Sequence, residues 1–117
     1  MVKTNKSPLK YIPQKGDLVW MDFDPTIGHE QKGVRPAIVV SDKGFNQKSG
    51  LAYVCPITST SKNYPYRIKL NALQVKGFVM TEHLKSIDWN TRNVKFIEKA
   101  SLNIIESVKN CIAAIID

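Results

Sequence analysis

The chain is a series of short, apolar, β-forming runs, and only its end has the residue spacing of a helix. Turn-forming residues separate the runs, and β-forming residues are frequent within them, which favours strands. Several short strands at this spacing favour a small, curled, SH3-like barrel, mainly β, with a C-terminal helix closing one side. The runs are "GDLVWMDFD", "PAIVVS", "LAYVCPIT", "YRIKL", "GFVMTEHLKSID" and "NVKFIEKA".

Three segments sharpen this prediction. In "GDLVWMDFD" one alternating face is fully apolar and the other mostly so, which predicts a strand packed on both sides. "SDKGFNQKSG" has the composition of a turn and would close a long hairpin between residues 36–41 and 51–58. "GFVMTEHLKSID" reads as one bent strand or as two short ones.

The C-terminal segment predicts the helix. Leu102, Ile105, Val108 and Ile112 recur at helical spacing, and Ser101 is a suitable N-cap. At the other end, residues 1–13 predict a basic, flexible tail, which leaves residues 14–117 as a single domain.

Charge is the most informative part of the composition. The 117 residues carry a formal net charge of +7, with a pI near 9.5. Such a balance indicates a polyanionic partner, most often nucleic acid, although a merely basic surface is the alternative. The N-terminus lacks the apolar core of a signal peptide, and no apolar run approaches the roughly 18 residues of a membrane helix. We therefore expect a cytoplasmic protein without a membrane partner.

The chain shows no pattern typical of a metal or cofactor site. Cys55 and Cys111 lie apart in apolar runs, which predicts buried free thiols and leaves a disulfide as the alternative. P-loop, dinucleotide and zinc-protease motifs are absent from the sequence. We expect no cofactor and no metal ligands.

The first polar constellation is "GHEQKGVRP", residues 28–36. Because Pro36 restricts the residue before it, Arg35 should be held rigidly at the mouth of a strand, suited to clamp a phosphate. A surface ion pair is the alternative for this arginine. Glu30 is either a structural partner of the guanidinium or half of an acid/base couple, and His29 is either solvated or catalytic.

The second constellation is "CPITSTSKNYP", where hydroxyl groups and a lysine follow an apolar strand. Thr58, Ser59 and Ser61 could donate to phosphate oxygens, and Tyr64 and Tyr66 could stack on bases. The alternative is a turn stabilised by the hydroxyl groups, with the tyrosines in the core. If the strands at 36–41 and 51–58 pair, the two constellations meet.

Three segments together resemble the MazF/PemK toxins of toxin–antitoxin modules, namely residues 11–41, "PITSTSKNYPY" and "LKSIDW". The resemblance implies an SH3-like barrel of the CcdB/PemK/MazF kind that forms a homodimer. It also implies a sequence-specific, ribosome-independent endoribonuclease that cleaves single-stranded mRNA without a metal and so inhibits translation. The 2′-hydroxyl would attack the adjacent phosphorus, giving a 2′,3′-cyclic phosphate and a 5′-hydroxyl.

The resemblance also assigns roles to residues. Arg35 and Thr58 match the family's central catalytic pair, and Glu30 is our candidate for the base. Arg35 would cover the charge of the phosphorane, and Thr58 would donate to a non-bridging oxygen. The candidate RNA-binding residues are Gln31, Lys32, Ser59, Ser61, Lys62, Tyr64 and Lys85.

His29 stays an additional catalytic candidate. One branch of the family combines a histidine here with an arginine and an aspartate on a later strand, where this chain has Met80 and Glu82. The other branch shares "SK-x-YP" and "KSI-x-W" with this chain, and we assign the protein to that branch. Its implied partner is an acidic, MazE-like antitoxin. The rival functions are a non-catalytic, gyrase-poisoning CcdB-like toxin and a basic nucleic-acid-binding module.

Overall fold

The computed structural model describes residues 10–23, 33–60 and 64–117, and within them it shows a mainly β fold closed by a C-terminal helix. This confirms the predicted fold class. The strands are β1 (Asp17–Asp22), β2 (Val34–Val39), β3 (Leu51–Thr58), β4 (Arg67–Asn71), β5 (Lys76–Met80), β6 (Lys85–Asp88) and β7 (Lys95–Lys99). The helices are α1 (Lys43–Ser49), the 3-10 helix η2 (Thr81–His83) and α2 (Leu102–Ile116).

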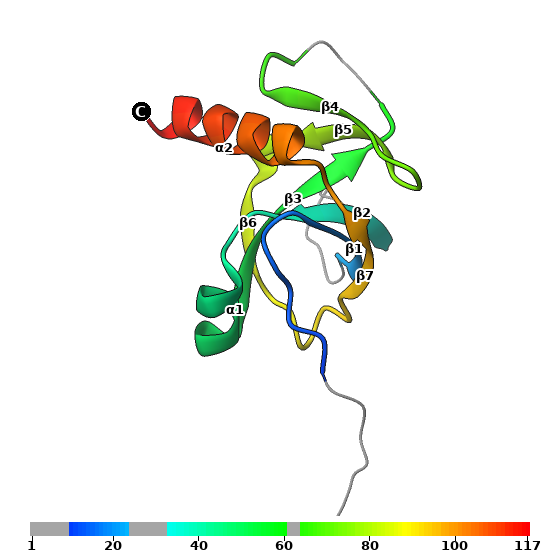
Figure 1. Ribbon diagram of the computed structural model, residues 1–117, viewed down its shortest axis with the longest axis vertical. Coiled ribbons are helices and arrows are strands. Elements are labelled where there is room, and N and C mark those ends of the chain that lie inside the picture. The colour runs from blue at the N-terminus through cyan, green and yellow to red at the C-terminus, as the bar shows by residue number, and fades with distance from the viewer. Residues whose placement is uncertain (1–9, 24–32, 61–63) are drawn as a thin grey trace, which may run out of the picture.

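The strands form one antiparallel sheet in the order β4-β5-β3-β2-β1-β7, and β6 pairs with β3 outside this path. β3 divides the sheet, because residues 51–54 pair with β6 while residues 57–58 pair with β5. In Figure 1 the strands β1, β2, β3, β6 and β7 curl around the lower part of the molecule, and β4 and β5 lie beside α2 above them. The run at 77–88 is therefore two strands, β5 and β6, joined by η2.

Successive apolar side chains along the central strands point to opposite faces of the sheet, so they form two hydrophobic clusters, one on each face. On β1, Val19 and Met21 face the cluster inside the curled strands, which also contains Trp89. Leu18 faces the second cluster, which Val108 of α2 closes from outside. The prediction that this strand packs on both sides holds for Leu18 but fails further along, because Trp20 is 45% exposed.

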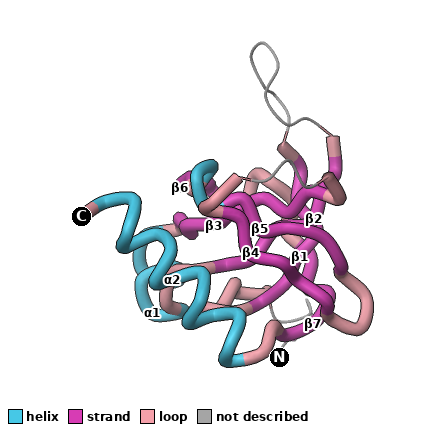
Figure 2. The backbone as a smooth tube through the Cα atoms, turned by 90° about the horizontal axis from the view of Figure 1, so that it is seen from above, coloured by secondary structure: helices cyan, strands magenta, loops and turns pink. Residues whose placement is uncertain are grey.

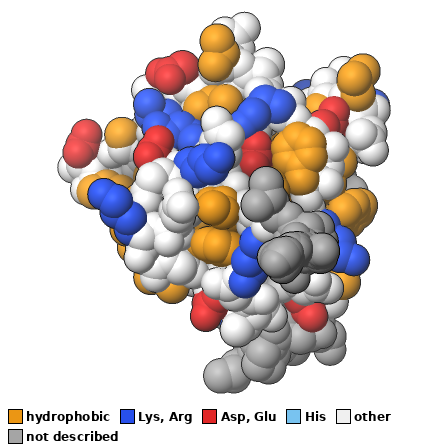
Figure 3. All heavy atoms as spheres, turned by 60° about the horizontal axis from the view of Figure 1, so that its bottom comes forward, with side chains coloured by type: hydrophobic (Ala, Val, Ile, Leu, Met, Phe, Trp, Pro, Cys, Tyr) orange, Lys and Arg blue, Asp and Glu red, His pale blue; other side chains and the backbone are white. Residues whose placement is uncertain are grey.

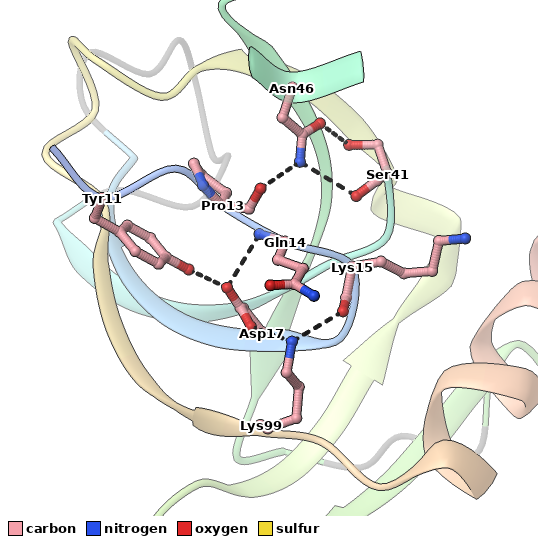
Figure 4. A network of polar contacts seen from close by, with 8 residues as sticks. All are labelled: Tyr11, Pro13, Gln14, Lys15, Asp17, Ser41, Asn46 and Lys99. Atoms are coloured by element: carbon pink, nitrogen blue, oxygen red, sulfur yellow. Dashed lines mark hydrogen bonds and ion pairs between the residues drawn. The ribbon is translucent and has the colours of Figure 1, made fainter. Parts of the chain in front are cut away.

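The predicted turn at residues 41–50 is wrong, since this segment contains α1. The Asp42 side chain accepts a hydrogen bond from the Gly44 N–H, and Gly50 ends the helix in the left-handed conformation. The buried Asn46 anchors the helix, because its Nδ2 donates to the Pro13 carbonyl at 2.8 Å (Figure 4). The long hairpin itself is confirmed, because β2 and β3 pair as antiparallel neighbours.

The chain is already packed before residue 14, which corrects part of the predicted flexible tail. Pro13 is buried, and the Tyr11 hydroxyl donates to Asp17, whose carboxylate also accepts from the Gln14 N–H at 3.0 Å. Lys99 Nζ donates to the other Asp17 oxygen at 2.6 Å, which completes the network in Figure 4. Residues 1–9 of the predicted tail lie outside the described residues.

Helix α2 begins as predicted, because the Ser101 hydroxyl accepts from the Ile104 N–H at 3.3 Å. Figure 2 shows α2 running along one side of the strands. Val108 is fully buried beneath it, whereas Leu102 in its first turn is 79% exposed. Among the described residues, no helix has the length and apolar character needed to cross a membrane.

Both cysteines are free, as predicted. Cys55 is buried inside the sheet, and this burial, with a smaller effect from Glu82, raises the pKa of its thiol to about 12. Cys111 is only half-buried, so the prediction of a buried thiol holds for Cys55 alone.

Candidate active site at the ends of β2 and β3

Arg35 and Thr58 come together because β2 begins where its antiparallel neighbour β3 ends. The paired register ends with Ala37 opposite Pro56; continued by two residues it puts Arg35 opposite Thr58, and both residues line one cleft. Residues directly opposite each other point to the same face of a sheet. The predicted meeting of the two polar constellations is therefore confirmed for this pair.

The two side chains share an open cleft of about 340 Å³. Arg35 and Thr58 are both half-buried, so each is held by the fold and still reaches solvent. Ser59, a predicted RNA-binding residue, is exposed at the same cleft. The cleft lining consists of Val34, Arg35, Pro36, Ile57, Thr58, Ser59 and Lys76.

Lys76 was missed at the level of sequence. It lies at the start of β5 and reaches the cleft because β5 pairs with the end of β3. Its ammonium donates to the Ala72 and Leu73 carbonyls at 3.0 and 3.3 Å, which holds the charge in place. The sequence around Lys76 carries no local signal of such a position.

Backbone contacts orient Thr58. The Thr60 N–H donates to Thr58 Oγ1 at 3.2 Å, so this bond uses the oxygen as acceptor and does not use the hydroxyl proton. Gly77 lies close behind: a Cβ at this position would be 2.3 Å from the Thr58 carbonyl oxygen. The glycine thus lets β5 approach β3 at the residue that the cleft depends on.

Arg67 organises the chain that follows the cleft. Its Nη1 donates to the Thr60 carbonyl at 3.3 Å, and its guanidinium lies 4.3 Å from the centre of the Tyr64 ring. Nε donates to Glu82 at 3.0 Å, which fixes the guanidinium plane. Tyr64, a predicted RNA-binding residue, is 51% exposed, and Tyr66 is also exposed instead of lying in the core. Arg67 itself was not among the sequence candidates.

Lys85 is not among the residues that line the cleft. Lys85 lies on β6, with its ammonium 5.2 Å from the centre of the Phe23 ring. The remaining candidates, His29, Glu30, Gln31, Lys32, Ser61 and Lys62, lie outside the described residues. The residues flanking 24–32 are joined, since the Phe23 N–H donates to the Gly33 carbonyl at 3.0 Å. Phe23 and Gly33 therefore lie next to each other, and Gly33 precedes Arg35 by two residues.

The charge of the surface is mixed. Figure 3 shows several Lys and Arg side chains on one face with acidic side chains between them. Within residues 10–23, 33–60 and 64–117, His, Cys, Asp and Glu form no group of three that could hold a metal ion. The described residues of the cleft supply a guanidinium, an ammonium and hydroxyl groups.

The curled sheet with this cleft defines a small β half-barrel that presents cations and hydroxyl groups where two neighbouring strands end. A family model described as a PemK-like, MazF-like toxin of type II toxin–antitoxin systems matches residues 14–116. The chain belongs to this family, as the resemblance implied.

Relatives agree with this assignment. The endoribonuclease toxin MazF of Escherichia coli K12 is 43% identical over 83 residues, which cover 71% of this chain and 75% of that protein. The endoribonuclease toxin ChpB of the same strain is 32% identical, covering 89% of this chain and 94% of its own length. These homologues are endoribonucleases.

Solved structures share the fold. A crystal structure of MazF from Deinococcus radiodurans superposes with a TM-score of 0.86 at 38% identity, covering 92% of this chain and 98% of that one. A crystal structure of MazE–MazF from the same organism has a TM-score of 0.82 at 36% identity, covering 91% and 97% of the two chains.

Proposed function

We propose that this protein is the toxin of a type II toxin–antitoxin system and acts as a sequence-specific, metal-independent endoribonuclease on single-stranded RNA. The observation that carries the proposal is the cleft in which Arg35 faces the same side of the sheet as Thr58. Family membership and the endoribonuclease relatives support it. Cutting mRNA independently of the ribosome would inhibit translation and growth.

The reaction is an in-line displacement. The 2′-oxygen forms a bond to the adjacent phosphorus while the bond from phosphorus to the 5′-oxygen breaks. The proton of the 2′-hydroxyl passes to a base, and the departing 5′-oxygen takes up a proton. The products carry a 2′,3′-cyclic phosphate and a 5′-hydroxyl, and no water is consumed in this step.

Arg35 and Thr58 are suited to stabilise the five-coordinate phosphorus that forms midway through this reaction. Negative charge builds up on the non-bridging oxygens as phosphorus becomes five-coordinate, and fixed donors aimed at those oxygens stabilise it. Pro36 restricts the backbone of Arg35, so the base of this side chain is already positioned before RNA binds, and its planar guanidinium can donate to two phosphate oxygens. The Thr58 hydroxyl, accepting from the Thr60 N–H, can donate its proton to a second oxygen. Glu30 is the proposed base, and His29 the alternative.

Flanking nucleotides would be held by nearby cations and hydroxyl groups. Lys76 and Ser59 line the cleft and would contact the phosphates next to the cut. Tyr64 would stack on a base with the face that Arg67 leaves open. The remaining proposed contacts are Gln31, Lys32, Ser61, Lys62 and Lys85.

The proposed partners follow from the same surface. A net charge of +7 suits both RNA and the acidic segment of an antitoxin. The Deinococcus radiodurans toxin was crystallised with MazE, which supports a MazE-like antitoxin and a similar complex here. We propose a homodimer as the active form.

The test is cleavage of an unstructured RNA pool in EDTA, followed by mapping of the ends. We expect fragments with 5′-hydroxyl ends at one short motif, and a single 2′-deoxy substitution before the cut should abolish cleavage without abolishing binding. Binding without cleavage of any RNA would favour a nucleic-acid-binding module. Neither binding nor cleavage, together with inhibition of gyrase, would favour the CcdB-like alternative.

A further inference from the structure

A half-buried ion pair lies beside two groups that the proposed function uses. Arg67 Nε is 3.0 Å from Glu82 Oε2, and the two side chains are only 11% and 26% exposed. Arg67 stands opposite Met80 in the register of β4 with β5, so Glu82, two residues further along in η2, comes within its reach. Neither member of the pair lines the cleft.

The Arg67 guanidinium makes two further contacts. Its Nη1 donates to the Thr60 carbonyl at 3.3 Å, and its central carbon lies 4.3 Å from the centre of the Tyr64 ring. A planar guanidinium can combine these contacts, because its donors lie along its edge and its face packs on an aromatic ring. The backbone supports the same arrangement, since the Arg67 N–H donates to the Tyr64 carbonyl at 3.3 Å.

The Thr60 peptide connects this arginine to Thr58. Its carbonyl accepts from Arg67, and its N–H donates to Thr58 Oγ1 at 3.2 Å. A chain of hydrogen bonds thus runs from the ion pair through the Thr60 peptide to Thr58. Because Oγ1 is the acceptor, the proton of the same hydroxyl is directed away from the Thr60 N–H.

We propose that Arg67 is a positioning residue for the nuclease, an inference that rests on the proposed function. Through the Thr60 peptide it orients the Thr58 hydroxyl, which the reaction uses. Through its flat face it orients the Tyr64 ring, which RNA binding uses. Glu82 holds the guanidinium in the one orientation that serves both groups.

Amide hydrogen exchange, followed by NMR, tests the positioning without RNA. The Thr60 N–H of the wild type is bonded to Thr58 Oγ1 and should exchange more slowly than an unbonded amide. In Arg67→Ala we expect this amide to exchange on the order of tenfold faster, because the peptide loses the contact that holds it. Thr58→Ala removes the acceptor and gives the exchange rate for a fully lost bond.

Double variants test whether Arg67 acts through these two residues. Arg67→Ala alone should lower kcat roughly tenfold, because a catalytic donor is displaced, and should also raise KM. In a Thr58→Ala background the same change should leave kcat as it is, since the hydroxyl that Arg67 orients is absent. In a Tyr64→Leu background it should leave KM as it is, because the ring is absent.

Three single variants complete the design. Glu82→Gln keeps an oxygen that can accept from Nε and should retain most of kcat. Arg67→Lys keeps the charge without the planar fork and should behave like Arg67→Ala. Lys69→Ala is the matched control: it removes an exposed cation from the same strand and should leave kcat and KM at wild-type values. Urea unfolding of each variant allows rates to be compared at equal folded fraction.

The outcomes separate this inference from the function it depends on. If the wild type cuts RNA and Arg67→Ala lowers kcat equally with and without the Thr58 hydroxyl, the ion pair is only structural and the inference is overturned, while the nuclease stands. Unchanged Thr60 exchange in Arg67→Ala would overturn it as well. If no RNA is cut but Thr60 exchange accelerates, the positioning contact stands and the proposed function fails.

Discussion

Two polar regions of the molecule use similar side chains in opposite ways. At the start of β1, Asp17 is 3% exposed, and it accepts hydrogen bonds from Tyr11, from the Gln14 N–H and from Lys99. At the ends of β2 and β3, Arg35 and Thr58 are half-buried beside an open cleft. The first region joins residues 11–17 to the distant Lys99 of β7, and the second faces outward.

The difference concerns what each group's hydrogen bonds are for. A buried carboxylate must be satisfied within the protein, because an unpaired charge there is costly, so the Asp17 network serves stability. Groups that act on a phosphate must keep bonding capacity for it, so they belong where strands end and solvent enters. We therefore expect changes in the cleft to remove activity with little loss of stability, and changes at Asp17 to do the reverse.

The largest effect should come from the cleft. Arg35→Ala and Thr58→Ala should each slow RNA cleavage on the order of 100-fold or more, since each removes a donor aimed at developing charge. Single-turnover cleavage measures the loss. The free energy of unfolding, from urea titration, should change by less than about 1 kcal/mol.

Conservative variants distinguish donor chemistry from mere packing. Thr58→Ser keeps the hydroxyl and should retain most of the rate, whereas Arg35→Lys loses the planar, two-pronged donor and should not. Lys43→Ala, which removes an exposed cation on α1, should cut RNA like the wild type. Wild-type rates for Arg35→Ala or Thr58→Ala would remove that residue from the mechanism.

The meeting of Arg35 with Thr58 could be predicted because it depends on local patterns. Two apolar runs joined by a short segment pair as antiparallel neighbours, and the polar residues at their ends then lie together. Lys76 could not be predicted in this way, because it reaches the cleft only through the pairing of β5 with β3. Trp20 was expected inside, but the cluster beneath α2 ends before it.

The helix α1 was missed for a related reason. Its seven residues include Gly44 in the first turn, so local propensity for a helix is weak. What stabilises it is distant: the buried Asn46 bonds to the Pro13 and Ser41 carbonyls, and Trp89 donates to its backbone oxygen. Such contacts between remote residues leave no periodic pattern in the sequence.

A smaller effect should appear where the fold supports the cleft. In Gly77→Ala the new Cβ would lie 2.3 Å from the Thr58 carbonyl oxygen, at a φ of +147° that side chains rarely adopt. We expect a loss of about 2 kcal/mol in unfolding free energy, together with slower cleavage, because Thr58 must shift. Gly77→Ala should therefore lower both the unfolding free energy and the cleavage rate, whereas changes in the cleft or at Asp17 should each lower only one of them.

Gly50→Ala is the control for Gly77→Ala. Gly50 also has a positive φ, of +74°, but a Cβ there would meet nothing within 4 Å. It should cost about 1 kcal/mol through backbone strain alone and leave cleavage unchanged. Equal rates for Gly77→Ala and Gly50→Ala would show that the close approach of β5 does not position Thr58.

The smallest effect should come from Tyr11→Phe, which removes one donor from Asp17 and should cost about 1 kcal/mol of unfolding free energy near neutral pH. Burial, with the Asp17 carboxylate, raises the pKa of Tyr11 above its ordinary value of 10.0. The folded state therefore holds this proton more tightly than the unfolded state does. The stabilisation is fully present below pH 10 and falls, by up to about 1.4 kcal/mol per pH unit, as the pH rises above 10.

The phenylalanine variant lacks this titration, so its stability should fall less steeply above pH 10 than that of the wild type. Urea titrations at pH 8, 10 and 11 measure the two slopes, and cleavage near neutral pH should be unchanged because Tyr11 does not touch the cleft. Parallel stability curves would mean that the Tyr11 proton does not contribute to folding. If Tyr11→Phe cleaved RNA more slowly at an equal folded fraction, the buried network around Asp17 would influence the cleft. The proposed separation of the two regions would then be wrong.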